Sequence, residues 1–279
     1  MRHRKTQIST VLTGFLLAAM LLSTGAWAQD TTEAQGKADK TGTNPINFTH
    51  DLRLYHDFSK LETTGDGEQS VTTLEFRMPF ADGKWQFRTR LRLINDLEVD
   101  FDNDGINELD DRGVGVVDMR LLTVPYLNMK KRRALAVGVE VSLPTGNAIT
   151  GSQTLSLGPQ VFGVFFAPFG ISNSIIAPAV QYKFSIDEEA GVDDVDQFLF
   201  DVFFLKTSAD KQYWMLVNPQ FVIDNEKDLN FGFLDVEVGM MLDKYFGTKG
   251  HSAYIRPSMG YGGDALTESS IEIGYKVIW

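Results

Sequence analysis

The chain of 279 residues contains no cysteine. Disulfide bonds and thiolate metal sites are therefore excluded, so the fold must be held by a packed core or by a closed ladder of backbone hydrogen bonds. Beyond the N-terminal region the sequence also lacks a long hydrophobic run, since no segment there approaches the roughly 20 apolar residues of a membrane-spanning helix. If this chain crosses a membrane, it must cross as β-strands.

Positive charge and histidine are scarce as well. The 26 Lys and Arg residues stand against 37 Asp and Glu, which gives a net charge of −11. This excludes a nucleic-acid partner, because a phosphate-binding surface needs a basic footprint. Beyond the N-terminal region only His50, His56 and His251 remain, and none has an obvious serine and acid beside it. A catalytic nucleophile needs such a base, so the sequence predicts no catalytic residue and no enzyme.

The N-terminus has the three parts of a secretory signal peptide. Residues 2–5 are Arg-His-Arg-Lys, an apolar run extends from Val11 to Leu22, and Ala26-Trp27-Ala28 places small residues where signal peptidase cuts. We expect a signal peptide over residues 1–28 and, because no cysteine follows the cut, no lipid anchor. The apolar run is too short for the alternative, which is an N-terminal membrane anchor.

The composition changes twice after the predicted cleavage site. Residues 29–47 are almost wholly polar, so they cannot offset their ordering entropy and are predicted to form a flexible periplasmic tail. From Phe48 onward, segments of mixed polarity are separated by clusters of Gly, Asp, Asn, Pro and Ser, which is typical of strands joined by turns. We expect strands at approximately 48–59, 70–80, 84–95, 113–127, 132–143, 154–167, 174–186, 196–206, 212–223, 230–242, 252–261 and 270–279.

In most of these segments apolar and polar side chains alternate with the two-residue period of a strand. In the third segment, for example, Trp85, Phe87 and Leu91 share one face, while Arg88 and Arg90 share the other. A soluble β-sandwich alternates in the same way. Alternation therefore predicts strands but does not decide whether they lie in a membrane.

The polarity of the connections favours a membrane barrel. If the first strand runs outward from the periplasm, the acidic connections 96–112 and 187–196 are extracellular loops, whereas the basic segment 130–133 is a periplasmic turn. We therefore expect an all-β fold over residues 48–279, a transmembrane antiparallel up-and-down β-barrel of about 12 strands in the outer membrane of a Gram-negative bacterium. An exported β-sandwich or jelly roll is the alternative.

The last segment ends the chain on an aromatic residue. Ile271, Ile273, Tyr275, Val277 and Trp279 form one unbroken apolar face, which suits contact with lipid. Chains that close an outer-membrane barrel commonly finish on such a strand, and the barrel assembly machinery recognises it. We expect Tyr275, Val277 and Trp279 to form this assembly signal.

The tryptophans support the same orientation. Trp85, Trp214 and Trp279 all fall at predicted periplasmic strand ends. A tryptophan ring is apolar but carries one polar N–H, so it favours the interface between lipid and water. We expect these three rings to form an aromatic belt at the periplasmic rim of the barrel.

Two stretches resemble a known family. Residues 113–121 (Gly-Val-Gly-Val-Val-Asp-Met-Arg-Leu) and 138–147 (Gly-Val-Glu-Val-Ser-Leu-Pro-Thr-Gly-Asn) are similar to paired strands of the MetA-pathway phenol-degradation-like family of outer-membrane transporters. Residues 254–257 and 260–263 resemble its penultimate hairpin, whereas Asp118 stands two residues later than the acid of the family motif. The resemblance implies a barrel over most of 48–279 that passes small solutes, with aromatic compounds as one candidate class.

Assigning the apolar face of each strand to lipid leaves a set of charged residues facing inward. Those on the first four strands are mainly arginines and those on strands eight and ten are acids, so opposite walls carry opposite charge. An unpaired ion in a dry core costs several kcal/mol, so water or tight ion pairs must accompany these residues. The charges that we expect to set solute selectivity are Arg53, Arg77, Arg88, Arg90, Arg92, Arg120, Asp201, Asp235 and Glu237.

Two interpretations of the arginines stay open. In the first, they place fixed positive charge along a conducting path and select anionic or polarisable solutes; Arg88, Arg90 and Arg92 are then the main residues. In the second, they brace a closed lumen by pairing with acids. The acids expected to pair with them are Glu75, Asp118 and Glu140.

The sequence therefore predicts a channel for passive uptake of small solutes that are aromatic or anionic. The inward-facing Phe162 and Phe166 favour the aromatic class, whereas the arginines favour acidic compounds, including acidic oligosaccharides. A structural or adhesive barrel with a closed, charge-braced lumen is the alternative. The expected partners are the lipid bilayer, lipopolysaccharide, the barrel assembly machinery and the solute.

The acidic loop matches a calcium-binding loop in the first half of its spacing. Acids stand at positions 1, 3, 5, 9 and 12 and glycine at position 6 of the loop, as in calcium-binding loops. The candidate ligands are Asp100, Asp102, Asp104, Glu108 and Asp111. The flanks are predicted strands rather than helices, so a solvated acidic loop that meets the divalent ions of lipopolysaccharide is the alternative. No other cofactor is expected.

Overall fold

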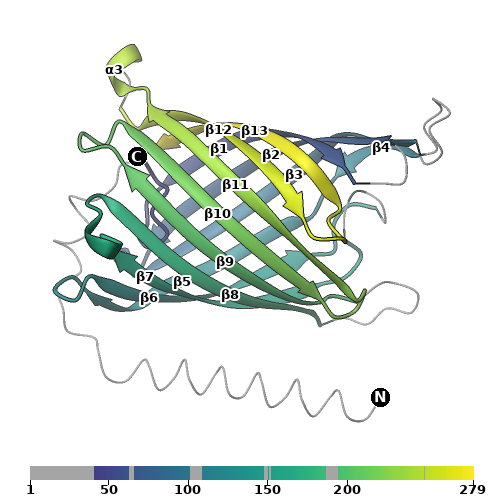
Figure 1. Ribbon diagram of the computed structural model, residues 1–279, viewed down its shortest axis with the longest axis horizontal. Coiled ribbons are helices and arrows are strands. Elements are labelled where there is room, and N and C mark those ends of the chain that lie inside the picture. The colour runs from purple at the N-terminus through teal and green to yellow at the C-terminus, as the bar shows by residue number, and fades with distance from the viewer. Residues whose placement is uncertain are drawn as a thin grey trace, which may run out of the picture.

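The computed structural model describes residues 41–62, 66–100, 109–147, 150, 152–186, 194–247 and 249–279. Within these residues the chain forms one sheet of antiparallel strands that closes on itself (Figure 1). The strands are β1 (Asp51–Leu61), β2 (Asp66–Phe80), β3 (Trp85–Asp100), β4 (Leu109–Val114), β5 (Val117–Asn128), β6 (Arg133–Leu143), β7 (Ser156–Phe166), β8 (Ser174–Ser185), β9 (Asp196–Thr207), β10 (Tyr213–Asp224), β11 (Leu229–Met241), β12 (His251–Tyr261) and β13 (Thr267–Ile278). The helices η1 (Pro168–Gly170) and α3 (Asp243–Phe246) lie in turns. Neither helix of the described residues is long and apolar enough to span a membrane.

Consecutive strands pair except for β4 and β5, and β1 against β13 closes the sheet. β5 and β4 pair with successive parts of β3, so together they occupy one position around a barrel of 12 strands. The predicted antiparallel up-and-down barrel is therefore confirmed. The C-terminus and α3 lie at one end, which we call the periplasmic end, and the β3–β4 hairpin lies at the other, extracellular end (Figure 1).

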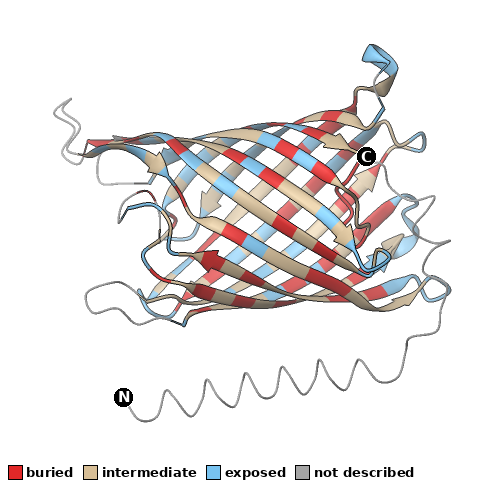
Figure 2. Cartoon of the chain, turned by 180° about the vertical axis from the view of Figure 1, so that it is seen from behind, coloured by how far each residue is buried: buried red, intermediate tan, exposed pale blue. Residues whose placement is uncertain are grey.

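The barrel wall has an apolar outer face and a largely polar inner face. On β1, for example, Leu52 and Leu54 are 39% and 51% exposed on the outside, whereas Arg53 is 6% exposed on the inside. Figure 2 shows this alternation of buried and exposed residues along most strands. Exposed Leu, Ile, Val, Phe and Met side chains recur on nearly every strand. A continuous apolar exterior of this extent is the surface that a membrane barrel presents to lipid.

Residues 96–112, which were predicted to form an acidic loop, are in part strand and belong to the β3–β4 hairpin. β3 continues to Asp100 and β4 begins at Leu109, so both ends of this segment are paired strand. The physical reason is a small apolar cluster near the extracellular end, in which Ile94, Leu97 and Val99 are buried. Burying this cluster stabilises strand beyond the predicted end of the third segment.

The predicted aromatic belt is wrong for one of its three tryptophans. Trp85 and Trp279 occupy outward positions, and the Trp279 side chain is 63% exposed. Trp214 instead points into the barrel, is 2% exposed, and donates a hydrogen bond from Nε1 to Glu237 at 2.6 Å. Both faces of β10 are apolar near this end, so periodicity did not show which face was inward.

The chain end closes the barrel at the periplasmic rim. The backbone N–H of Trp279 donates to the carbonyl of His50 at 3.1 Å, and the two rings stack with centroids 6.0 Å apart. The Trp279 ring also lies 6.5 Å from Phe76 on β2. The terminal tryptophan thus joins the last strand to the first two.

Replacing Trp279 with serine is expected to lower the fraction of chains that assemble severalfold, because it removes the ring contacts with His50 and Phe76 and the predicted assembly signal. The measurement is heat-modifiable gel mobility of membrane fractions. Trp85→Ser is the matched control, since Trp85 stacks on Phe80 at the same rim (centroids 6.5 Å) but lies outside the last strand. Equal losses in both variants would contradict a special role of the chain end.

Candidate functional site

The candidate site is the inside of the barrel. The structure places every charged residue of the predicted selectivity set on an inward position, and none of them is exposed on the outer face. The residues are Arg53, Arg77, Arg88, Arg90, Arg92, Arg120, Asp201, Asp235 and Glu237. Their role in selectivity stays a prediction, but their common location follows from strand alternation.

The first arginine group lies on β1 and β2, near the periplasmic end. Arg53 donates from Nε to Asp51 at 2.8 Å, and the same nitrogen lies 3.4 Å from Glu75. Arg77 lies two residues after Glu75 on β2, and Nη2 of Arg77 is 2.6 Å from Oε1 of Glu75. These acids are nearly inaccessible, since the side chains of Asp51 and Glu75 are 0% and 4% exposed. The four residues form one buried network of alternating charge.

The second group crosses from β3 to β5 and β6. Arg88 pairs with Glu140, and Arg90 lies 3.0 Å from Asp118. Arg92 lies 2.5 Å from the same carboxylate. Pairing with Glu75, Asp118 and Glu140 is the bracing interaction predicted from the sequence, and the geometry confirms these contacts.

A third network, on β10 to β13, was largely missed by sequence reasoning. Lys276 is fully buried, lies 3.1 Å from Glu237, and packs between the rings of Trp214 (4.8 Å) and Tyr254 (4.5 Å). Arg256 lies 2.7 Å from the other oxygen of Glu237. The sequence did contain one signal for this network: Lys276 lies on the face of the last strand that is opposite the apolar face, and therefore points inward.

On β5 to β11 the periplasmic half of the lumen has an apolar wall, which the predicted set of inward charges did not include. Inward side chains of β5 to β11 form a buried cluster there, including Leu122, Val164, Leu205 and Leu216. Sequence reasoning assigned apolar faces to lipid and therefore missed it, because both faces of these strand ends are apolar.

The segment before β1 packs into this cluster. Ile46 is 6% exposed and belongs to the cluster, and Phe48 packs against it. Thr41 is fully buried, and Arg53 donates from Nη2 to the carbonyl of Gly42 at 2.6 Å. The prediction of a flexible tail is therefore wrong for residues 41–47. Residues 29–40 and the predicted signal peptide, 1–28, lie outside the described residues.

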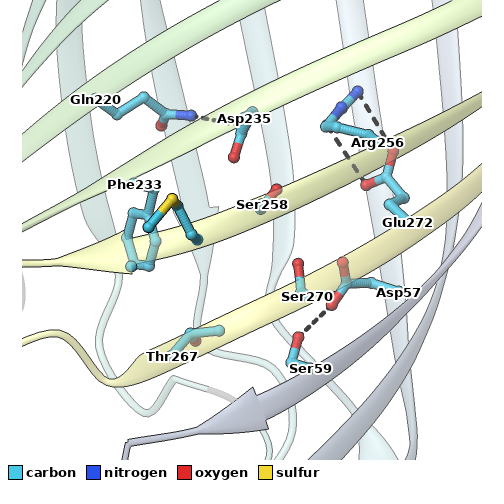
Figure 3. A pocket seen from close by; sticks show the side chains of 12 residues that line it. Asp57, Ser59, Gln220, Phe233, Asp235, Arg256, Ser258, Thr267, Ser270 and Glu272 are labelled. Carbon is cyan, nitrogen blue, oxygen red and sulfur yellow. Dashed lines mark hydrogen bonds and ion pairs between the residues drawn. The ribbon is translucent and has the colours of Figure 1, made fainter.

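Toward the extracellular end the lumen opens into a cavity of about 270 Å³ between β1 and β10 to β13 (Figure 3). Its walls combine the carboxylates of Asp57, Asp235 and Glu272 with the guanidinium of Arg256, hydroxyl groups and one aromatic ring, Phe233. Gln220 donates to Asp235 at 2.8 Å across this wall. The cavity is therefore polar, mainly anionic, and large enough for a small solute.

Not every lumen charge is paired. Among the described residues, Arg120 on β5, Asp201 on β9 and Asp235 on β11 have no ion-pair partner within 4.0 Å. The Asp201 carboxylate feels the negative charge of Asp235 and the positive charge of Arg120. Within the described part of the chain, Arg120 is thus a guanidinium without an ion-pair partner, and Asp201 and Asp235 are carboxylates whose hydrogen bonds come from the neutral side chains Asn218 and Gln220.

The structure describes only two of the five predicted calcium ligands. Asp102, Asp104 and Glu108 lie outside the described residues, and Asp100 and Asp111 lie on the adjacent strands β3 and β4. Within the described part of the chain, no group of three or more His, Cys, Asp or Glu side chains has the arrangement of a metal site. Calcium binding at this hairpin stays a prediction.

Comparisons with known proteins bear on the fold. The sequence matches no family model and no curated protein. An outer membrane channel from Pseudomonas putida F1 has a similar structure, with a TM-score of 0.66, 10% identity, and coverage of 87% of this chain and 100% of that chain. The NanC porin (TM-score 0.54, 10% identity, 82% and 98% coverage) and the KdgM porin (0.51, 8%, 82% and 99%) are also similar. The fold is that of an outer-membrane β-barrel. Together with the apolar exterior, it places the protein in the Gram-negative outer membrane.

Proposed function

We propose that this protein is an outer-membrane channel for the passive uptake of small solutes, of aromatic or anionic type. The observation that carries the proposal is a polar cavity at the extracellular end that leads to charged residues on opposite walls of a membrane barrel. A barrel of eight strands is filled by its side chains, and one of sixteen leaves a wide channel. Twelve strands allow a narrow, selective path. The similar structures that are channels support this function.

The path has to open at the periplasmic end before solutes pass. Residues 41–48 and the apolar cluster fill that end, and the arginine networks brace the wall above it. Movement of this segment would expose an apolar passage, which suits aromatic solutes because their rings favour apolar surroundings. Membership of the MetA-pathway phenol-degradation-like family is consistent with this route and stays a proposal.

The same contacts favour the second candidate function, a structural or adhesive barrel with a closed lumen. Single-channel recording in planar bilayers separates the two functions. A channel gives discrete conductance steps from purified, folded protein, whereas a braced structural barrel gives none. Absence of steps, with heat-modifiable mobility intact, would overturn the channel proposal.

Replacing Arg88, Arg90 and Arg92 together by alanine is expected to shift ion selectivity toward cations. The change removes three positive charges and leaves Asp118 and Glu140 without their guanidinium partners. The measurement is the reversal potential in a potassium chloride gradient. A triple alanine replacement of Lys130, Lys131 and Arg132, which are exposed in the β5–β6 turn, removes equal charge outside the lumen and is the control. An unchanged reversal potential in the lumen variant would contradict a selective role.

The other expected partners follow from the location of the barrel in the outer membrane. The apolar exterior contacts the lipid bilayer, while contacts with lipopolysaccharide and with the barrel assembly machinery are proposals that rest on the acidic extracellular hairpin and on Tyr275, Val277 and Trp279. Calcium at residues 100–111 would join the hairpin to the lipopolysaccharide surface, where divalent ions are concentrated.

A further inference from the structure

Several inward side chains in the middle of the barrel have polar atoms without partners. Within the described part of the chain, these atoms include Nε of Arg120, Nε2 of Gln160, Oδ1 of Asp201 and Oδ1 of Asn218, beside Nε of Arg88 and Arg90. Gln160 is 5% exposed and Asn218 is 8% exposed. Buried polar atoms are nearly always hydrogen-bonded in folded proteins, so a cluster of such atoms indicates a place where a ligand supplies the missing partners.

The free donors and the free acceptors lie on different parts of the wall. The donors, Arg120 on β5 and Gln160 on β7, lie on the two strands that flank β6, where Arg120 is opposite Glu140 and Gln160 is opposite Gly138. The acceptors, Asp201 on β9 and Asn218 on β10, lie on neighbouring strands, and Asn218 is hydrogen-bonded to Asp201. The site therefore has a donor side and an acceptor side.

The intervening strand β8 separates the two sides. It places Gln181 opposite Gln160 and Ala179 beside Asp201, where only a methyl group projects. Asp235, whose charge acts on Asp201, also lines the cavity at the extracellular end. A solute that enters through the cavity therefore reaches this site before the apolar cluster.

The charges distinguish between ligand types. A simple anion beside Arg120 would face the fields of Asp201 and Asp235, and a simple cation beside these acids would face Arg120 and its neighbours Arg88 and Arg77. A molecule with both charges meets an opposite charge at each end, and each charge-assisted hydrogen bond stabilises it more than a neutral one does.

We propose that Arg120, Gln160, Asp201 and Asn218 form a binding site for a small dipolar solute, with its anionic group on the donor side and its cationic group on the acceptor side. This proposal rests on the channel function and adds the substrate class: small zwitterions of the α-amino acid type. The arginines paired with acids then shape the wall, while the unpaired one binds the solute.

The test is a binding measurement on the full-length protein purified in detergent, by saturation-transfer NMR or calorimetry. The probes are glycine, acetate and methylammonium, which carry both charges, the anion alone and the cation alone. Glycine is expected to bind most tightly. Arg120→Gln and Asp201→Asn are each expected to weaken glycine about tenfold, the effect of losing one charge-assisted hydrogen bond.

Two variants in the periplasmic turns are matched controls. Lys244→Gln and Asp210→Asn make the same changes of charge at an exposed ion pair, where the side chains are 59% and 52% exposed, and should leave glycine binding unchanged. Heat-modifiable mobility checks the fold of every variant. If acetate binds as tightly as glycine, if no probe binds, or if the two lumen variants bind like wild type, the proposal is overturned.

This experiment separates the two proposals because binding requires no passage. Glycine binding without single-channel conductance would overturn the channel function and leave a dipolar ligand site. Conductance without preferential glycine binding would leave the channel and overturn the assigned substrate class.

Discussion

Deleting residues 41–47 is expected to raise single-channel conductance severalfold, from little or none in the native chain to clearly resolved steps. These residues include fully buried Thr41 and Ile46, which packs in the apolar cluster of the periplasmic half. Their loss leaves an unfilled passage below the arginine networks, which water and ions can enter. The measurement is recording in planar bilayers at equal protein density.

Two further variants sharpen this test. Ile46→Ser keeps the segment but removes its largest apolar contact in the cluster, so an intermediate rise with frequent closures is expected. Deletion of residues 30–36 shortens the chain by the same length and leaves 41–48 unchanged, so it should behave like the native protein. If deleting 41–47 leaves conductance unchanged while mobility shows a folded barrel, the segment does not close the channel.

Replacing Glu237 with alanine is expected to destabilise the barrel by about 3–5 kcal/mol, the usual effect of breaking a buried ion pair. Glu237 accepts from Lys276, Arg256 and Trp214, and the Lys276 side chain is 0% exposed. Without the carboxylate, a lysine with no access to water loses its counterion. Urea unfolding in lipid vesicles measures the difference.

The control is an ion pair of the same type at the surface. Asp210 and Lys244 lie 2.9 Å apart in the periplasmic turns, with more than half of each side chain exposed. Asp210→Ala should cost much less than Glu237→Ala, because solvent screens an exposed pair. Lys276→Met should restore part of the stability of Glu237→Ala when the two are combined, since it removes the uncompensated charge. An equal loss for the buried and the exposed pair would contradict this account.

The strands and the inward charges could be predicted because both depend on a local pattern. Alternation with period two places Arg88 and Arg90 on one face wherever the strand lies, so their inward position needs no knowledge of neighbouring strands. The expected pairs with Asp118 and Glu140 also follow, because those acids occupy inward positions on the next strands.

Other features depend on three-dimensional relations that the sequence does not carry locally. The N-terminal segment is polar in composition, yet Ile46 is buried because the barrel provides an apolar interior for it. Trp214 and Leu205 lie on strand ends that are apolar on both faces, so no period marks their direction. Among the described residues, Arg120 has no ion-pair partner, unlike Arg88 beside it on β3. This difference depends on the reach of each side chain across the register of β3, β5 and β6.

The buried lysine on β13 has a consequence for the order of assembly. Glu237 lies on a strand that precedes the last one, and one of its two cationic partners, Lys276, arrives with the final residues of the chain. A chain that stops before β13 therefore keeps an open sheet edge and lacks both the Lys276 contact to Glu237 and the Glu272 contact to Arg256. Full length thus becomes a condition for stability, and products that end early remain substrates for periplasmic proteases.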